Sequence, residues 1–493
     1  MKKTLRVLAL IMTLLMFLPV IVACKKDSGN EGGNEGGNGN VVSTDPDDPY
    51  ASRLPAYDWD EDIFYILSRD GESTDPAASF EVWRESLTGD VVGDAVWNRN
   101  ETLRQKYNFI VDENRVDNTY TEAQTLYEAQ DDVYDLVMYQ PTKVFSHASA
   151  GFLLDLNTIP YIDFEHPTWN KEINTQLTIA GKLYSTSSQF LLLDKKRTYC
   201  MFYNRELARE YDLGSLEAYV DANAWTLDVF EVTCKALSFD IDGGGGGHIG
   251  DNFGLATEGP ASFAALLTGA GFTLGTNDGE TITLTGATKA MDDIVTAVGK
   301  TWNDKTVTTI PEDHVPFDYY TSVKIFTAER ALFMLSFPSE FDVKDGLNAN
   351  CTFEFGVMPF PKYSSTQERY YNMNNYHNSA LFSIPYTVAD PAQVGFYLQA
   401  ISEESCKTTY TAYIDSKCKV QDSYDELTAR MLDLCFQSAT YDIVACLDPG
   451  GIFKIITEQV PNFRTNVFVR LYQGKGDAPQ TALDEYIATI STN

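Results

Sequence analysis

Short apolar runs alternate with amphipathic stretches between residues 62 and 140. Three runs rich in β-branched and aromatic residues predict strands, at 62–69, 109–111 and 135–140. Apolar residues at helical spacing predict a helix between the first two strands: Val92, Val96, Leu103 and Tyr107. Thr119 and Glu122 predict a capping box that opens a second helix. Strands that alternate with helices pair in parallel, so this segment predicts a doubly wound α/β unit.

The same alternation continues toward the C-terminus. Further strands are predicted at 198–205, 331–337 and 355–362. Further helices are predicted at 206–211, 261–271, 287–303 and 391–404, and from 422 onward. Another helix is predicted to begin after Thr226, which would be its N-cap. A chain of 493 residues is longer than one hydrophobic core usually holds, so we expect two lobes.

The ends of the first and third predicted strands carry polar and aromatic side chains. Ser68 and Arg69 end the first strand, and Tyr139 and Gln140 end the third. In doubly wound sheets, ligands bind beyond the carboxyl ends of the strands. These four residues are therefore candidates for ligand contact on topology alone.

The N-terminus has the layout of a secretory signal. Three basic residues precede an apolar run at 7–23, and Cys24 follows the run. The sequence Ile21-Val22-Ala23-Cys24 resembles the lipobox of bacterial lipoproteins. That resemblance implies that residues 1–23 are a signal peptide, that Cys24 is diacylated, and that the protein is anchored by lipid on the outer face of the cell membrane. The alternatives are an ordinary signal peptide with an incidental cysteine, or a single membrane-spanning helix.

Residues 24–55 are expected to tether the folded part to that anchor. The segment contains SGNEGGNEGGNGN and almost nothing apolar to bury before Tyr50. Such a composition is typical of a flexible linker rather than a packed element. This favours the lipoprotein interpretation over the two alternatives.

Charge and cysteine content exclude several classes of partner. The chain has 70 acidic and 37 basic residues, a formal net charge of −33, which disfavours nucleic acid. Seven cysteines follow Cys24, without the spacing of a zinc site. Local disulfides are possible for two pairs, Cys406 with Cys418 and Cys435 with Cys446, but we favour buried thiols.

A glycine-rich loop faintly resembles a calcium-binding loop. Asp240 and Asp242 suit the first ligand positions, but Gly244 stands where a third ligand is needed. Asp251 replaces the bidentate glutamate that would end such a loop. We therefore favour a surface loop, and we expect neither a metal nor a cofactor.

The order of several short motifs resembles the extracellular solute-binding proteins of family 1, the carbohydrate-binding components of ABC importers. The motifs run over most of 60–470: YDLVMY, GFLLDLNTI, GKLY, CMFYNREL, AWTLDVF, FGLATEG, AERALFMLSFPSE, FEFGVMPFPK, SALFSIP and PAQVGFYLQAI. The resemblance implies a two-lobe fold of the periplasmic-binding-protein type (type II), in which each lobe is a β-sheet flanked by helices and the lobes are hinged around a central cleft. It implies three chain crossings, near 184–195, 370–377 and 430.

Carried over to this sequence, the resemblance sets expected lobe boundaries. The N-lobe is expected to comprise 56–188 and 372–430, and the C-lobe 189–371 and 431–493. The implied function is capture of a carbohydrate, most simply an oligosaccharide, by a monomer that delivers it to ABC permease subunits without catalysis. Closure of the lobes on the ligand would be a hinge motion.

The resemblance also adds candidate ligand contacts. Many members have Gly-Pro-Trp where this chain has Phe337-Pro338-Ser339, so Phe337 or Tyr376 is expected to replace the stacking tryptophan. Asp194, Glu258 and His377 are the further polar candidates. Sugars need aromatic platforms and hydrogen-bonding groups, and 13% of the residues are aromatic.

Two other functions stay open at the level of sequence. A secreted glycoside hydrolase would need a pair of carboxylates, and acidic residues are abundant, but no catalytic motif such as GxSxG or HExxH is present. A surface lipoprotein that binds polysaccharide or protein without transport would carry the same anchor and tether.

Overall fold

The computed structural model describes residues 49–492 apart from 71–77, 242, 319, 342–345 and 421–422, and for 417–420 and 423–424 it describes only the backbone. The predicted signal peptide, Cys24 and most of the predicted tether lie outside the described residues. Contacts group Asp47–Asn493 into one unit. No helix in the described part of the chain is both long enough and apolar enough to cross a membrane.

The first sheet has four strands, in the order β12-β3-β1-β2. Their bounds are Asp62–Arg69 for β1, Phe109–Val116 for β2, Leu136–Tyr139 for β3 and Leu381–Ser383 for β12. β1 pairs in parallel with β2 and β3, and β12 pairs antiparallel with β3. The helices of this lobe are α2 (Val91–Tyr107), α3 (Thr119–Ala129), α4 (Pro141–Ser149), α14 (Pro391–Lys407) and α15 (Thr409–Cys418). The predicted β-α-β-α-β unit is confirmed, since its three strands pair in parallel in one sheet and its two helices connect them.

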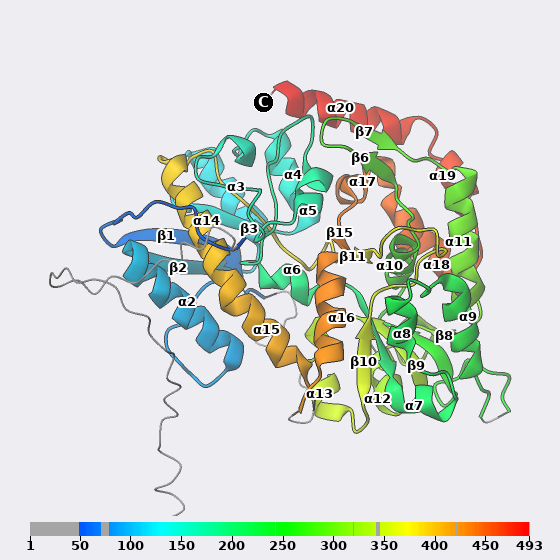
Figure 1. Cartoon of the computed structure of the whole chain (residues 1–493). Helices are drawn as coiled ribbons and strands as arrows, with labels where there is room; N and C mark the ends of the chain where they lie inside the picture. The colour runs from blue at the N-terminus through cyan, green and yellow to red at the C-terminus, as the bar shows by residue number, and fades with distance from the viewer. Residues whose placement is uncertain are drawn as a thin grey trace, which may run out of the picture. The chain divides into compact units, whose positions relative to one another are not determined.

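The second sheet has five strands, in the order β10-β4-β9-β5-β8. Their bounds are Cys200–Asn204 for β4, Phe253–Thr257 for β5, Thr308–Thr309 for β8, Ala331–Ser336 for β9 and Phe355–Met358 for β10. β5 is parallel to β8 and β9, whereas β4 is antiparallel to both β9 and β10. The helices around it are α7 (Arg205–Glu210), α9 (Leu227–Ala236), α10 (Ser262–Gly269), α11 (Lys289–Trp302), α12 (Thr321–Thr327) and α16 (Glu426–Gln437). Two separate α/β sheets therefore form two lobes (Figure 1).

The chain passes between the two sheets three times. The first crossing leaves the edge of the first sheet at Thr186, passes through α6 (Leu192–Lys196) and enters β4. The second leads from β10 through β11 (Asn372–Met373) to β12, and the third leads from α15 to α16 and β15 (Ala439–Thr440). β11 and β15 pair in parallel as a small sheet of their own. Figure 1 shows α6, β11 and β15 between the two large sheets.

Buried apolar packing also joins the lobes on one side. Val92 of α2 and Tyr413 of α15 belong to the same buried cluster as Phe202 and Phe355 of the second sheet. At the C-terminus, Tyr486 of α20 (Ala478–Thr492) donates a hydrogen bond to the carbonyl oxygen of Phe145 in α4, at 2.7 Å. The final helix thus contacts the first lobe, and the exact lobe boundaries given above stay a prediction.

Several local predictions need correction. The N-cap of α3 is Asn118, whose Oδ1 accepts from the backbone N–H of Thr121 at 3.1 Å, so the predicted capping box at Thr119 is wrong by one residue. The strand predicted at 355–362 ends at Met358 because Pro359 and Pro361 have no N–H to donate. Cys435 and Cys446 are buried free thiols, which excludes a disulfide between them in this structure.

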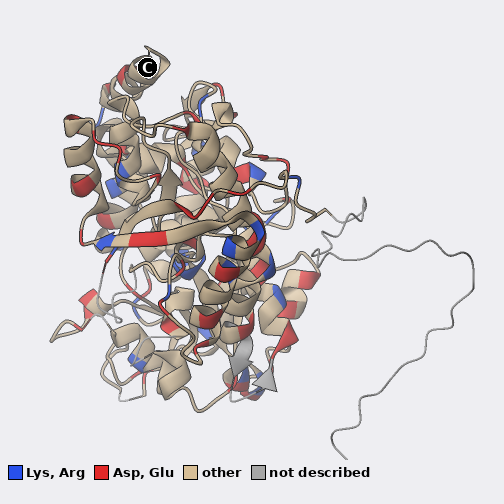
Figure 2. Ribbon diagram, turned by 90° about the vertical axis from the view of Figure 1, so that its left-hand side faces the viewer, with Lys and Arg blue, Asp and Glu red and all other residues tan. Residues whose placement is uncertain are grey.

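Acidic and basic residues are interspersed along the ribbon (Figure 2). In the glycine-rich loop, the carboxylate of Asp240 accepts from the N–H groups of Gly243 and Gly245, and that of Asp251 from Ile241 and His248. These hydrogen bonds between the two carboxylates and backbone N–H groups stabilise the conformation of the loop. Within the described ranges, no group of three or more metal-ligating side chains lies together.

Candidate functional site

A polar and aromatic cluster lies at the carboxyl ends of two inner strands of the second sheet. Glu258 follows β5 and Phe337 follows β9. Tyr199 connects them, because its hydroxyl donates to Glu258 Oε1 and its ring centroid lies 4.1 Å from that of Phe337. We call Arg197, Tyr199, Glu258 and Phe337 the strand-end cluster. Two of its members, Glu258 and Phe337, are residues that the sequence predicted as ligand contacts.

Arg197 completes the cluster from the first crossing. Its guanidinium carbon lies 3.8 Å from the centroid of the Phe337 ring, and its Nη1 donates to Ser339 Oγ at 2.9 Å. The side chain is 2% exposed, and its Nε has no hydrogen-bond partner among the described residues. A cation stacked on a ring away from water is held more strongly than an exposed one. One face of Phe337 is therefore occupied by Arg197, so a sugar could stack there only after this pair separates.

Asp194 is a structural residue of the first crossing. Its carboxylate oxygens both accept from Lys195 Nζ at 2.8 Å, and Ser187 Oγ donates to the same carboxylate. Burial raises the pKa of Asp194, although the Lys195 ammonium opposes that shift. The backbone oxygen of Asp194 also accepts from Asn374 Nδ2 at 2.9 Å, which ties the first crossing to the second.

Tyr376 is enclosed where the second and third crossings meet. Its ring lies 5.8 Å from Tyr441 and 5.6 Å from Phe453, and its hydroxyl accepts from the N–H of Asp442 at 3.0 Å. The residue is 2% exposed, so neither ring face is open to a ligand in this structure. The next residue, His377, is exposed.

The predicted contacts of the first lobe are mostly buried. Tyr139 is fully buried, with its hydroxyl 2.6 Å from Tyr127 Oη and 3.0 Å from His147 Nδ1. Ser68 is also fully buried and donates to Glu113 Oε1 at 2.5 Å. Arg69 and Gln140 are half-buried, and Gln140 is the N-cap residue of α4 without a side-chain capping bond. Direct ligand contact by all nine predicted residues stays a prediction.

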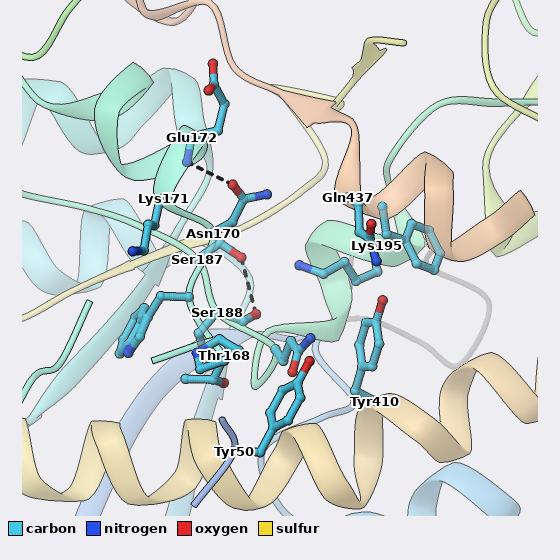
Figure 3. A pocket seen from close by; sticks show the side chains of 14 residues that line it. Tyr50, Thr168, Asn170, Lys171, Glu172, Ser187, Ser188, Lys195, Tyr410 and Gln437 are labelled. Atoms are coloured by element: carbon cyan, nitrogen blue, oxygen red, sulfur yellow. Dashed lines mark hydrogen bonds between the residues drawn. The ribbon is translucent and has the colours of Figure 1, made fainter. Parts of the chain in front are cut away.

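A pocket of about 450 Å³ lies beside the first crossing, and we call it the junction pocket (Figure 3). Its wall comes from both lobes: Tyr50, Pro167, Thr168, Trp169, Asn170, Lys171, Glu172, Ser187, Ser188, Gln189, Lys195, Tyr410, Phe436 and Gln437. Backbone bridges pair Thr186 with β12 and Ser188 with Trp169, which places this wall at the edge of the first sheet. On the other lobe, Phe436 and Gln437 end α16, which packs on the edge strand β10.

None of the nine predicted contact residues lines the junction pocket; Asp194 is adjacent to it through Lys195. The polar run STSSQ at 185–189, within the first predicted crossing, is the one signal in the sequence that points to it. The remaining wall residues come from segments far apart in the chain. These segments come together only because α14, α15 and α16 pack against one another and against the sheets.

Comparisons with known proteins show the fold. No protein-family model matches the chain, and no curated protein matches it. A cyclo/maltodextrin-binding protein solved in complex with maltotetraose is 13% identical, with a TM-score of 0.53, covering 88% of this chain and 97% of that one. UspC of M. tuberculosis is 14% identical, with a TM-score of 0.51, covering 85% of this chain and 99% of that one. The α/β two-lobe fold of the periplasmic-binding-protein type, predicted from the sequence, is confirmed.

Proposed function

We propose that this protein captures a carbohydrate outside the cytoplasm and delivers it to an ABC importer without changing it chemically. The proposal rests on the two-lobe fold with its three crossings. In this fold, an aromatic and charged cluster lies at the carboxyl ends of two inner strands of the second sheet. Ligands of open α/β sheets bind at such strand ends. The similar cyclo/maltodextrin-binding protein was solved with a linear sugar, maltotetraose, which supports an oligosaccharide as the ligand.

The strand-end cluster offers the groups that a sugar requires. Glu258 is half-buried and can accept hydrogen bonds from ligand hydroxyls, while Phe337 and Tyr199 provide ring surface. Gln140, at the end of β3, and His377, in the second crossing, would contribute further polar contacts. Since Arg197 and Tyr199 now cover Phe337, ligand entry would be accompanied by a rearrangement of the crossings, as in hinge closure.

The Glu258→Gln variant tests this site. The amide oxygen can still accept from Tyr199, so the fold should persist, but a charged acceptor for ligand hydroxyls is lost. We expect sugar affinity to fall by about 1.5–3 kcal/mol, the contribution of a hydrogen bond to a charged group. Glu354→Gln is the matched control, because the Glu354 side chain is 57% exposed and its carboxylate accepts from Arg209 at the surface. Equal affinities of the two variants in isothermal titration would contradict the placement of the ligand at the strand-end cluster.

The membrane location rests on the N-terminal sequence. Lys2, Lys3 and Arg6, the apolar run and Cys24 support a lipid anchor on the outer face of the cell membrane. ABC permease subunits would be the partners of this protein, which we propose acts as a monomer. Cys24→Ala should leave the protein unprocessed or release it into the medium. Cell fractionation measures this, and a variant that is processed and membrane-bound like the wild type would refute the lipid anchor.

A further inference from the structure

The walls of the junction pocket belong to segments of both lobes. Thr168, Asn170 and Glu172 come from the first lobe, and Phe436 and Gln437 come from α16. The first crossing forms the floor between them with Ser187, Ser188 and Lys195 (Figure 3). A rotation of one lobe against the other therefore changes the shape of this pocket.

The charges in the wall are already compensated. Lys195 pairs with Asp194 at 2.8 Å, Lys171 pairs with Glu165, and Glu172 pairs with Arg369 at 2.6 Å. An ion entering the pocket would find no unpaired counter-charge in this wall and would lose its hydration. The pocket is therefore suited to a neutral ligand.

The wall nevertheless presents hydrogen-bonding groups and rings together. The Lys195 side chain is 10% exposed and extends into the pocket (Figure 3). Its ammonium has three N–H donors, and the two hydrogen bonds within the described part of the chain both go to Asp194, which leaves one donor for a ligand oxygen. The rings of Tyr50 and Tyr410 stand at one side of the pocket and provide apolar surface beside these donors.

We infer that the junction pocket is a second ligand site, for a small neutral polyhydroxylated ring compound such as a sugar or a cyclic polyol. A volume of about 450 Å³ is within the range of small-molecule pockets. The same short helix, α6, connects this site with the strand-end cluster: Lys195 borders the pocket, and Arg197, its C-cap residue, lies on Phe337. Occupancy of the pocket therefore alters sugar affinity at the strand-end cluster, and this coupling rests on the proposed function.

Gln437→Trp tests the site by filling it. Gln437 is exposed at the last position of α16, so the indole can occupy the pocket without disturbing the core. Gln473→Trp is the matched control, because Gln473 is an exposed residue at the last position of α19 (Phe468–Gln473) and does not line the pocket. Tyr50→Ala removes a ring that is 38% exposed, with little expected effect on folding.

The probes are glucose, maltose and myo-inositol, titrated calorimetrically into the full-length protein and its variants. We expect saturable binding of at least one probe that is lost in Gln437→Trp, at least fivefold weaker in Tyr50→Ala, and retained in Gln473→Trp and Glu258→Gln. The site is refuted if none of the probes binds the wild type, or if the binding survives Gln437→Trp. Binding lost only in Glu258→Gln would support the strand-end cluster and overturn the second site.

Coupling is measured separately, by titrating an oligosaccharide that binds at the strand-end cluster with and without saturating probe. Coupling free energies between sites typically change affinity by about fivefold or more, and the effect is reciprocal. An oligosaccharide affinity that is the same in both titrations would overturn the coupling while leaving the second site in place.

Discussion

Replacing Asp135 by asparagine should stabilise the protein at alkaline pH and not at acidic pH. Asp135 precedes β3, and its Oδ2 accepts from the backbone N–H of Tyr65 at 2.7 Å. Burial raises the pKa of Asp135 from 3.8 to about 7, although this hydrogen bond opposes the shift. The folded state therefore holds the proton more tightly than the unfolded state does. Its stability is highest below about pH 4 and declines as the pH rises through about 7.

The size of the effect follows from the two pKa values. At 1.36 kcal/mol per pH unit, the interval from 3.8 to about 7 corresponds to about 4 kcal/mol, and partial exposure of Asp135 reduces this to about 2–4 kcal/mol. Asparagine keeps an oxygen that can accept from Tyr65 and removes the charge. The free energy of unfolding of Asp135→Asn, measured relative to that of the wild type, should therefore be about 2–4 kcal/mol larger at pH 8 than at pH 4.

Calorimetric melting of the wild type and the variant at pH 4, 6 and 8 measures this difference. Asp131→Asn is the matched control, because it replaces an exposed carboxylate in the same loop. A stability difference between Asp135→Asn and the wild type that does not change with pH would refute the reasoning. So would a gain that is confined to pH 4.

Two further predictions concern stability. Burial lowers the pKa of His147 to about 4, so the wild type should lose stability as the pH falls from 6.5 toward 4. His147→Gln should lack this loss, and an equal dependence of the melting temperature on pH in both proteins would contradict the prediction. At Gly395, an added Cβ would lie 2.2 Å from the carbonyl oxygen of Pro160 and 2.6 Å from Ile159 Cγ2. Gly395→Ala should therefore lower the free energy of unfolding by about 1–3 kcal/mol in denaturant titration, and an unchanged midpoint would show that the backbone gives way.

Sequence patterns predicted the strands better than they predicted the surroundings of single side chains. The apolar runs that became β1, β3, β4 and β9 were recognisable because a buried strand needs continuous apolar residues. Helix ends were less certain, since a cap depends on one local hydrogen bond, as the shift from Thr119 to Asn118 shows.

The candidate site was predictable only in part. The family resemblance pointed to Glu258 and Phe337, and both lie at the ends of parallel strands, on the same side of the second sheet. Topology pointed to Tyr139, which is a strand-end residue but is buried by Tyr127 and His147 from two neighbouring helices. Such contacts depend on how the helices before and after a strand pack against it, which the apolar pattern of the strand does not encode.

Non-catalytic capture of a carbohydrate is tested by calorimetric titration of the purified protein with a series of oligosaccharides, including maltotetraose, followed by chemical analysis of the recovered sugar. We expect saturable binding of at least one oligosaccharide, a higher melting temperature in its presence, and recovery of the sugar unchanged. Hydrolysis of the sugar would contradict non-catalytic capture and favour a glycoside hydrolase. The absence of binding across the series would contradict carbohydrate capture and favour a surface lipoprotein with another partner.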